Sequence, residues 1–131
     1  MQKILLKTSK RNELIDITSE VQVIVSNSKI KEGICLVYCP HTTASITINE
    51  NSDPDVKADL LGHLEKLVPE NSKFAHSEGN SDAHIKSALI GNNQVLIISD
   101  GKLQLGTWGG IFFAEFDGPR NRQAFVQLIK Q

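Results

Sequence analysis

The most regular alternation of apolar and polar residues lies at residues 44–50, in the sequence ASITINE. Every second residue from Ala44 to Ile48 is apolar, and the residues between them are polar. This two-residue period predicts a strand with one buried face. Extended backwards, the alternation places Thr43 and His41 on the polar face.

Three segments have helical signals. Residues 53–69 begin with Asp53 and Pro54, a residue pair typical of a helix start. An apolar stripe with helical spacing follows and places His63 at the edge of the core. Residues 81–91 predict a shorter helix, which Asn80 or Ser81 caps and Gly91 ends. Residues 18–30 fit either a strand or a helix, and a possible capping box formed by Ser19 and Gln22 favours the helix.

The remaining apolar segments predict strands at residues 2–8, 12–18, 33–39, 94–99, 102–105, 108–116 and 122–130. Strands and helices do not alternate strictly, so we expect one α+β domain over residues 1–131, with mostly antiparallel or mixed sheets. Residues 108–116 are apolar on both faces of the predicted strand, which therefore needs cover on both faces. Two or three helices can cover one face of a sheet of this size but hardly both. We therefore expect part of the second face to pack against another subunit.

The charge is balanced, with 14 basic and 15 acidic residues and a net charge of -1. We therefore expect neither nucleic acid nor a membrane surface as a partner. The first residues lack the apolar core of a signal peptide, so a cytoplasmic protein is expected. Cys35 and Cys39 lie about 13 Å apart along one strand. This distance excludes a mutual disulfide and predicts two buried free thiols.

Three of the four histidines lie in two polar strings, HTTASITINEN from His41 and HSEGNSDAH from His76 to His84. If the two strings meet in space, His41, His76 and His84 form a candidate site for a divalent metal such as zinc. The alternative is a set of loop histidines that form hydrogen bonds with nearby polar residues. His63 is expected to lie outside this site.

A second polar group precedes the last strand. Glu115 and Asp117 share a strand face, about 6.6 Å apart, beside a turn with Arg120 and Arg122. Two carboxylates could perform acid–base chemistry, and the arginines could bind phosphate. The favoured alternative is an ion-pair cluster that fixes the hairpin. No glycine-rich phosphate loop is present, so phosphate would bind to arginine or to the amides of residues 82–84.

Five ordered motifs resemble the YjbQ family, known as secondary thiamine-phosphate synthase enzymes: HTTASITINEN, DPDVKADLL, HSEGNSDAHIKSALIG, GKLQLGTW and EFDGPRNR. The chain departs from this family at Gly109, where members usually carry Gln. The resemblance implies a compact α+β fold, a homotrimer and a polar cleft near the subunit contacts. The residues that match the family's functional positions are His41, Thr42, Thr43, Glu50, His76, Asn80, Asp82, His84, Trp108, Glu115 and Arg120.

The resemblance also implies a reaction that joins a pyrimidine diphosphate to a thiazole phosphate and releases pyrophosphate. In this hypothesis Glu50, Asp82 and Glu115 are catalytic. Thr42, Thr43, Asn80, Trp108 and Arg120 bind the substrate, and the three histidines bind the metal. Magnesium would arrive with the substrate, since it prefers oxygen ligands. The alternative is a non-catalytic module that binds a metal or a small anion.

Overall fold

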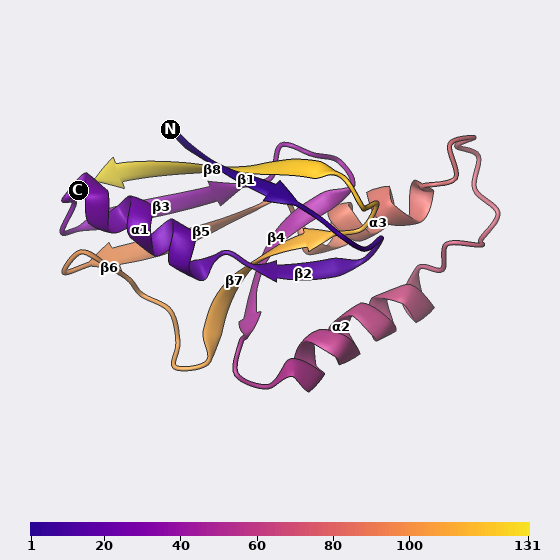
Figure 1. The fold of residues 1–131 in the computed structure, drawn as a ribbon, viewed down its shortest axis with the longest axis horizontal. Coiled ribbons are helices and arrows are strands. Elements are labelled where there is room, and N and C mark those ends of the chain that lie inside the picture. The colour runs from indigo at the N-terminus through magenta and orange to yellow at the C-terminus, as the bar shows by residue number, and fades with distance from the viewer.

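The computed structural model describes residues 1–131 and contains two antiparallel sheets and three helices (Figure 1). The five-stranded sheet has the order β1-β8-β3-β5-β6, and the three-stranded sheet has the order β2-β7-β4. The strands are β1 (Gln2–Lys7), β2 (Glu13–Asp16), β3 (Gly33–Tyr38), β4 (Ala44–Glu50), β5 (Asn93–Ser99), β6 (Lys102–Leu103), β7 (Gly109–Glu115) and β8 (Asn121–Lys130). The helices are α1 (Thr18–Ser28), α2 (Pro54–Leu67) and α3 (Ser81–Ile90). The predicted α+β domain is confirmed.

The main core lies between the two sheets. Alternate residues of β4 and β7, including Ile46 and Phe113, point into a cluster that also contains Val37 and Val126 of the larger sheet. A smaller cluster on the other face of β7 contains Ala114, Phe116 and Ala83 of α3. β7 is therefore buried on both faces, as its sequence predicts.

The helix predicted at residues 18–30 is α1, and Val21 and Val25 pack into the main core. The predicted capping box is wrong. Ile17 is the N-cap residue, and the Asp16 carboxylate accepts hydrogen bonds from the Thr18 backbone N–H and hydroxyl. A carboxylate just before the helix thus performs the role that the sequence pattern assigned to Ser19.

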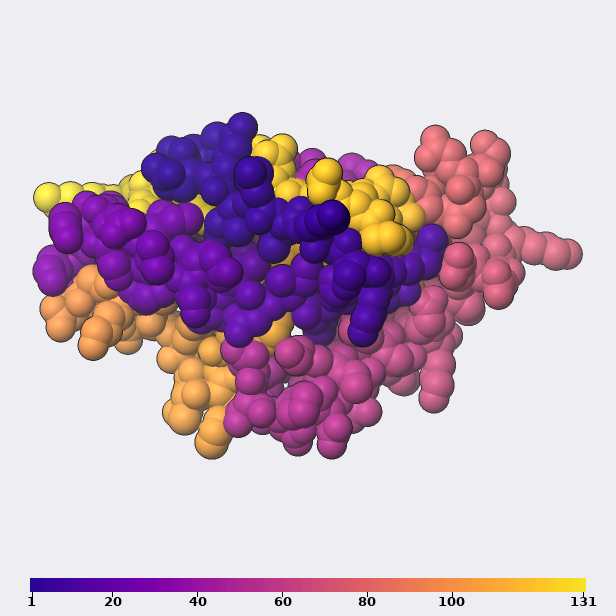
Figure 2. Space-filling model, in the orientation of Figure 1, coloured from indigo at the N-terminus to yellow at the C-terminus, as the bar shows by residue number.

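The helix α2 begins as predicted, because the Asp53 carboxylate accepts a hydrogen bond from the Asp55 N–H, and Pro54 occupies the first turn. No residue of α2 is fully buried, and Leu67 of its apolar stripe is 61% exposed. His63 is exposed on the surface, not at the core edge, and lines a depression away from the other histidines. Figure 2 shows that the segment after α2 forms one tip of the molecule.

The outer face of the five-stranded sheet is an uncovered apolar surface. Side chains that alternate with the core residues point outward, among them Leu5, Val95, Ile97 and Ile129, and all four are more than half exposed. α1 packs on the core side of this sheet, and no helix covers the outer face.

Both cysteines are free and buried in the main core. Burial raises the pKa of Cys35 and Cys39 to about 11, so both thiols remain protonated near neutral pH. None of the three helices is long and apolar enough to span a membrane.

Candidate functional site

A closed ion pair lies at the end of β7. Arg122 donates hydrogen bonds from Nε to Glu115 Oε1 at 2.9 Å and from Nη2 to the hydroxyl of Thr43 at 2.7 Å. The Glu115 carboxylate also accepts hydrogen bonds from the hydroxyl of Thr8 and from two backbone N–H groups. Glu115 is completely buried and fully paired. This geometry favours the ion-pair alternative for Glu115 over acid–base chemistry.

An open ion pair follows two residues later. The Asp117 Oδ2 atom accepts hydrogen bonds from Arg120 Nη2 at 3.0 Å and from Asn80 Nδ2 at 2.9 Å. Arg120 also donates from Nε to the backbone carbonyl of Asp117. The Nη1 group of Arg120 forms no hydrogen bond within the chain, and this side chain is 50% exposed.

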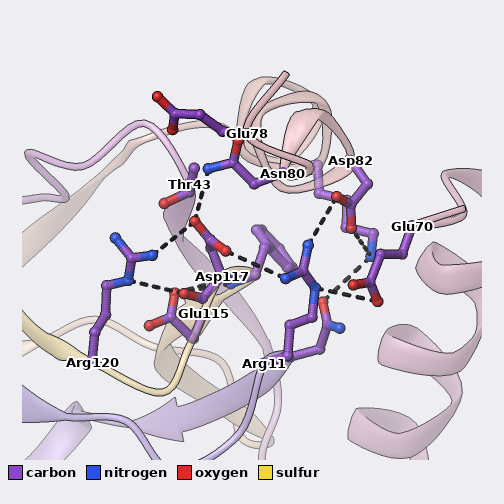
Figure 3. Close-up of polar contacts among 12 residues, drawn as sticks. Arg11, Thr43, Glu70, Glu78, Asn80, Asp82, Glu115, Asp117 and Arg120 are labelled. Atoms are coloured by element: carbon purple, nitrogen blue, oxygen red, sulfur yellow. Dashed lines mark hydrogen bonds and ion pairs between the residues drawn. The ribbon is translucent and has the colours of Figure 1, made fainter. Parts of the chain in front are cut away.

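Arg11 lies on the other side of Asp117 (Figure 3). Its Nη1 atom lies 3.4 Å from Asp117 Oδ1, and its Nη2 atom lies 3.0 Å from Asp82 Oδ1. Its Nε atom lies 3.5 Å from Glu70 Oε2. The 99% buried Lys86 lies 3.8 Å from Asp82 Oδ2 and donates to Glu65 at 2.8 Å. Asp82 is therefore held inside a charge network and does not line the pocket.

Beside the open ion pair lies a pocket of about 370 Å³ with no hydrophobic side chain in its lining. His41, Thr42 and Thr43 line it from the segment before β4, and Asn80 and His84 from the N-cap and first turn of α3. Asp117 and Arg120 line it from the turn before β8, and Arg122 from β8 itself. A neighbouring depression of about 390 Å³ shares three of these residues, His41, Thr42 and His84. The two polar strings of the sequence therefore meet in space.

Two serines help to fix this arrangement. Ser87 of α3 donates a hydrogen bond to the Ala44 carbonyl at 2.7 Å, and Ser45 of β4 donates to the Ser87 carbonyl at 3.1 Å. These reciprocal bonds attach α3 to β4 and so place His84 near His41. The β4 strand begins only at Ala44, so the alternation does not extend back to His41 as predicted. His41 instead packs edge-on against the core residue Phe113.

The three histidines do not form a metal centre within one chain. His76 and His84 lie with their ring centres 5.7 Å apart, and His41 lines the same pocket as His84. The His41 Nε2 atom accepts the backbone N–H of Gln123 at 3.1 Å, so the neutral ring carries its proton on Nδ1. No three or more His, Cys, Asp or Glu side chains are positioned together for a metal ion. The donor set therefore does not fit a three-histidine metal within one chain.

The electrostatics of His41 also favour a neutral ring. Burial lowers the pKa of His41 below its usual value of 6.5, and the positive charge of Arg122 lowers it further. A neutral ring with Nδ1–H is a hydrogen-bond donor to a ligand.

The backbone N–H groups at the start of α3, predicted to bind phosphate, are mostly occupied. The N–H groups of Ala83 and His84 both donate to the Asn80 carbonyl and are not free for an anion. Among the predicted amides, only that of Asp82 has no backbone partner. Phosphate binding at this site therefore depends on side chains, chiefly the half-exposed Arg120, with the Nη1 group of the more buried Arg122 beside it.

Glu50 and Trp108 lie at the opposite end of the three-stranded sheet from this pocket. Glu50 ends the strand that begins at Ala44, a length of about 20 Å. The Asn51 N–H donates to the carbonyl of Trp108, whose side chain is 62% exposed. The structure does not bring these two predicted site residues to the pocket of the same chain.

The sequence analysis missed Arg11 and Lys86. Lys86 had a detectable signal, because Ala83, Lys86 and Ile90 form a helical stripe whose apolar members pack in the smaller core. A lysine in a buried stripe indicates a partnered charge. Arg11 had no such signal, since its partners lie up to 106 residues away in the sequence.

The comparisons with known proteins agree with this fold. The family model described as UPF0047 protein YjbQ-like matches residues 2–131. The chain therefore belongs to the YjbQ/UPF0047 family.

Two relatives illustrate the extent of the similarity. The UPF0047 protein MJ1081 of Methanocaldococcus jannaschii is 60% identical over 124 residues, which are 95% of this chain and 90% of the relative. The UPF0047 protein YugU of Bacillus subtilis is 50% identical over 125 residues, 95% of each chain.

Solved structures support the same conclusion. An uncharacterised YjbQ/UPF0047 protein from Clostridium acetobutylicum superposes with a TM-score of 0.97 at 53% identity, over 98% of this chain and all of the other. A protein of unknown function from Sulfolobus solfataricus gives 0.96 at 34% identity, over 99% and 96% of the two chains.

Proposed function

We propose that the polar pocket binds a phosphate group of a small phosphorylated molecule. The observation that carries this proposal is the state of Arg120. Asp117 holds one edge of its guanidinium group, and the remaining Nη1 group is free beside a pocket without hydrophobic side chains. Guanidinium groups bind phosphate oxygens strongly because each bond combines a hydrogen bond with an opposite charge.

Two further polar groups of the pocket support a ligand that carries hydrogen-bonding groups besides its phosphate. Asn80 Oδ1 is buried without a hydrogen-bond partner in the chain, and a buried acceptor of this kind favours a donor. The neutral His41 ring offers an N–H group in the same pocket. A donor and an acceptor beside a phosphate-binding arginine suit a phosphorylated heterocycle.

The reaction that we propose is the joining of a pyrimidine diphosphate to a thiazole phosphate, as a weak side activity. A thiazole ring nitrogen forms a bond to the carbon that carries the diphosphate. The bond from that carbon to oxygen breaks, and its electron pair leaves with pyrophosphate. Arg120 stabilises the growing negative charge on this leaving group, and magnesium enters as part of the diphosphate substrate.

The first test is calorimetric titration of the protein with magnesium-free pyrophosphate. Arg120→Gln is expected to weaken binding at least about tenfold, because it removes a charged hydrogen-bond donor worth about 1.5–3 kcal/mol. The control is Lys102→Gln, which removes a positive charge on β6, away from the pocket, and leaves the affinity unchanged. Equal affinities of Arg120→Gln and the wild type would contradict the proposed site.

The second test measures product formation from the two substrates with magnesium. The wild type is expected to form thiamine phosphate, and Arg120→Gln to form less of it. Pyrophosphate binding without product would favour the alternative function, a non-catalytic module that binds small anions.

We also propose that the protein is a homotrimer in which the outer face of the five-stranded sheet packs against another copy. The support is the uncovered apolar surface that includes Val95 and Ile97. A head-to-tail ring would also bring unlike surfaces of neighbouring chains together. One such arrangement would place Glu50 and Trp108 of one chain near the pocket of the next.

Light scattering tests the assembly. The wild type is expected to show three times the chain mass of 14.4 kDa, and Val95→Lys with Ile97→Lys to show a lower mass. The matched control is Val23→Lys, at a residue 57% exposed on α1. A folded wild-type monomer at micromolar concentration would contradict the trimer.

A further inference from the structure

Arg11 connects three segments that are far apart in the sequence. It lies between β1 and β2, and its guanidinium group contacts Asp117 before β8, Asp82 in α3 and Glu70 after α2 (Figure 3). The pocket-lining residue Glu78 belongs to the same loop as Glu70. Arg11 itself does not line the pocket.

The two oxygens of Asp117 are divided between two arginines. Oδ1 lies beside Arg11, whereas Oδ2 accepts from Arg120 and Asn80. Arginine and carboxylate groups readily form two parallel hydrogen bonds. If Oδ1 were free, Asp117 could turn and bind both nitrogens at the end of Arg120. That pairing would remove the free Nη1 group from the pocket.

The charges lead to the same conclusion. Arg11, Lys86 and Arg120 are three positive charges beside the carboxylates of Asp82 and Asp117. Glu65 beside Lys86 and Glu70 beside Arg11 add two carboxylates, so the whole network has three positive and four negative charges. Removal of Arg11 takes one positive charge from this network, so its attraction for an anion is weaker.

We infer that Arg11 is a positioning residue, which holds Asp117 so that Arg120 keeps one free edge for an anionic ligand. The ligand in this inference rests on the proposed phosphate-binding function. The positioning of Arg120 by Arg11 is a property of the protein without ligand, so it can be tested separately.

A simple removal of Arg11 would also leave Asp82 with less compensation in a buried place, and it could unfold the protein. The test variant is therefore Arg11→Gln combined with Asp82→Asn, which removes both charges of that pair. Asp82→Asn alone is the matched control. If the double variant does not fold, Arg11→Lys replaces it, because a lysine keeps the charge but cannot contact both carboxylates as a planar fork does.

The ligand-free measurement is nuclear magnetic resonance of the arginine side chains. In the control, the two terminal NH₂ groups of Arg120 should differ, one held by Asp117 and one free. In the double variant both should become held, and their signals should shift. Unchanged Arg120 signals in the folded variant would overturn the inference, whatever the protein binds.

The second measurement is the affinity for magnesium-free pyrophosphate. The double variant should bind about tenfold more weakly than Asp82→Asn, which corresponds to about 1.4 kcal/mol, while the urea midpoints of the two remain similar. Equal affinities in the two variants would also overturn the inference. Absence of binding by the wild type would instead contradict the proposed function, and the arginine signals alone would then decide the role of Arg11.

Discussion

Two arginine–carboxylate pairs within eight residues of the chain have opposite relations to solvent. In the pair of Glu115 and Arg122, the exposed fractions of the side chains are 0% and 3%. In the pair of Asp117 and Arg120, they are 9% and 50%. In the closed pair both oxygens of Glu115 are bonded, and Arg122 is almost completely buried although its Nη1 group has no partner in the chain. In the open pair the free Nη1 group belongs to a half-exposed side chain, that of Arg120. The same chemistry therefore serves stability in one place and is available for a ligand in the other.

Strand alternation explains this difference. Arg122, Ala124 and Val126 are alternate residues of β8 and all are buried, so Arg122 points into the core side of the sheet. Arg120 precedes the strand and belongs to the turn, where no such alternation applies. An arginine at a core position of a strand needs a buried partner, and Glu115 at the end of β7 provides it.

The largest expected effect is on the closed pair. Arg122→Gln should lower the free energy of unfolding by about 3–5 kcal/mol, because it leaves the buried Glu115 carboxylate without its cation. Urea unfolding measures this loss. Arg120→Gln is the matched control and should cost less than about 1 kcal/mol, as is usual for exposed ion pairs. Similar losses in the two variants would show that burial does not make the closed pair contribute more to stability than the open pair.

The regular elements that support both pairs could be predicted from local sequence patterns. The alternation of residues 44–50 corresponds to β4, and Asp53 with Pro54 marks the start of α2. Each of these signals depends on neighbours within a few residues, which fix the backbone geometry directly.

The site was only partly predictable for the same reason. The meeting of His41 with His84 depended on the attachment of α3 to β4, which no local pattern describes. Glu50 lies in the same polar string as His41, yet the length of β4 separates the two. Arg11 joined the site only through tertiary contacts with Asp82 and Asp117.

An uncharged contact beside the pocket separates the effect of charge from the effect of burial. Ser87→Ala removes the hydroxyl that donates to the Ala44 carbonyl, and both groups are buried. The expected loss is about 1–2 kcal/mol in the free energy of unfolding, since a buried acceptor loses its donor. Ser19→Ala in α1 is the control. This serine is exposed and forms no side-chain hydrogen bond, so its loss should have little effect. If Ser87→Ala lowered the free energy of unfolding as much as Arg122→Gln, the cost would come from burial of an unpaired group and not from its charge.

The smallest expected effect concerns the wall of the open pocket. The pKa of His41 lies below 6.5, chiefly because of burial, so the unfolded chain binds a proton more readily than the folded protein does. The resulting stability is present above about pH 6.5 and is lost as the pH falls through the lowered pKa of the folded protein. Protonation of His41 also adds a hydrogen to Nε2, which then faces the Gln123 N–H whose hydrogen bond it accepts in the neutral form.

Urea unfolding at about pH 7.5 and about pH 5.5 tests this expectation. Between these two pH values the free energy of unfolding should fall less in His41→Gln than in the wild type. His63→Gln, at the exposed histidine of α2, should retain the wild-type loss. Equal pH dependence in His41→Gln and the wild type would mean that His41 titrates like an exposed histidine and that the pocket wall is more solvated than its packing against Phe113 indicates.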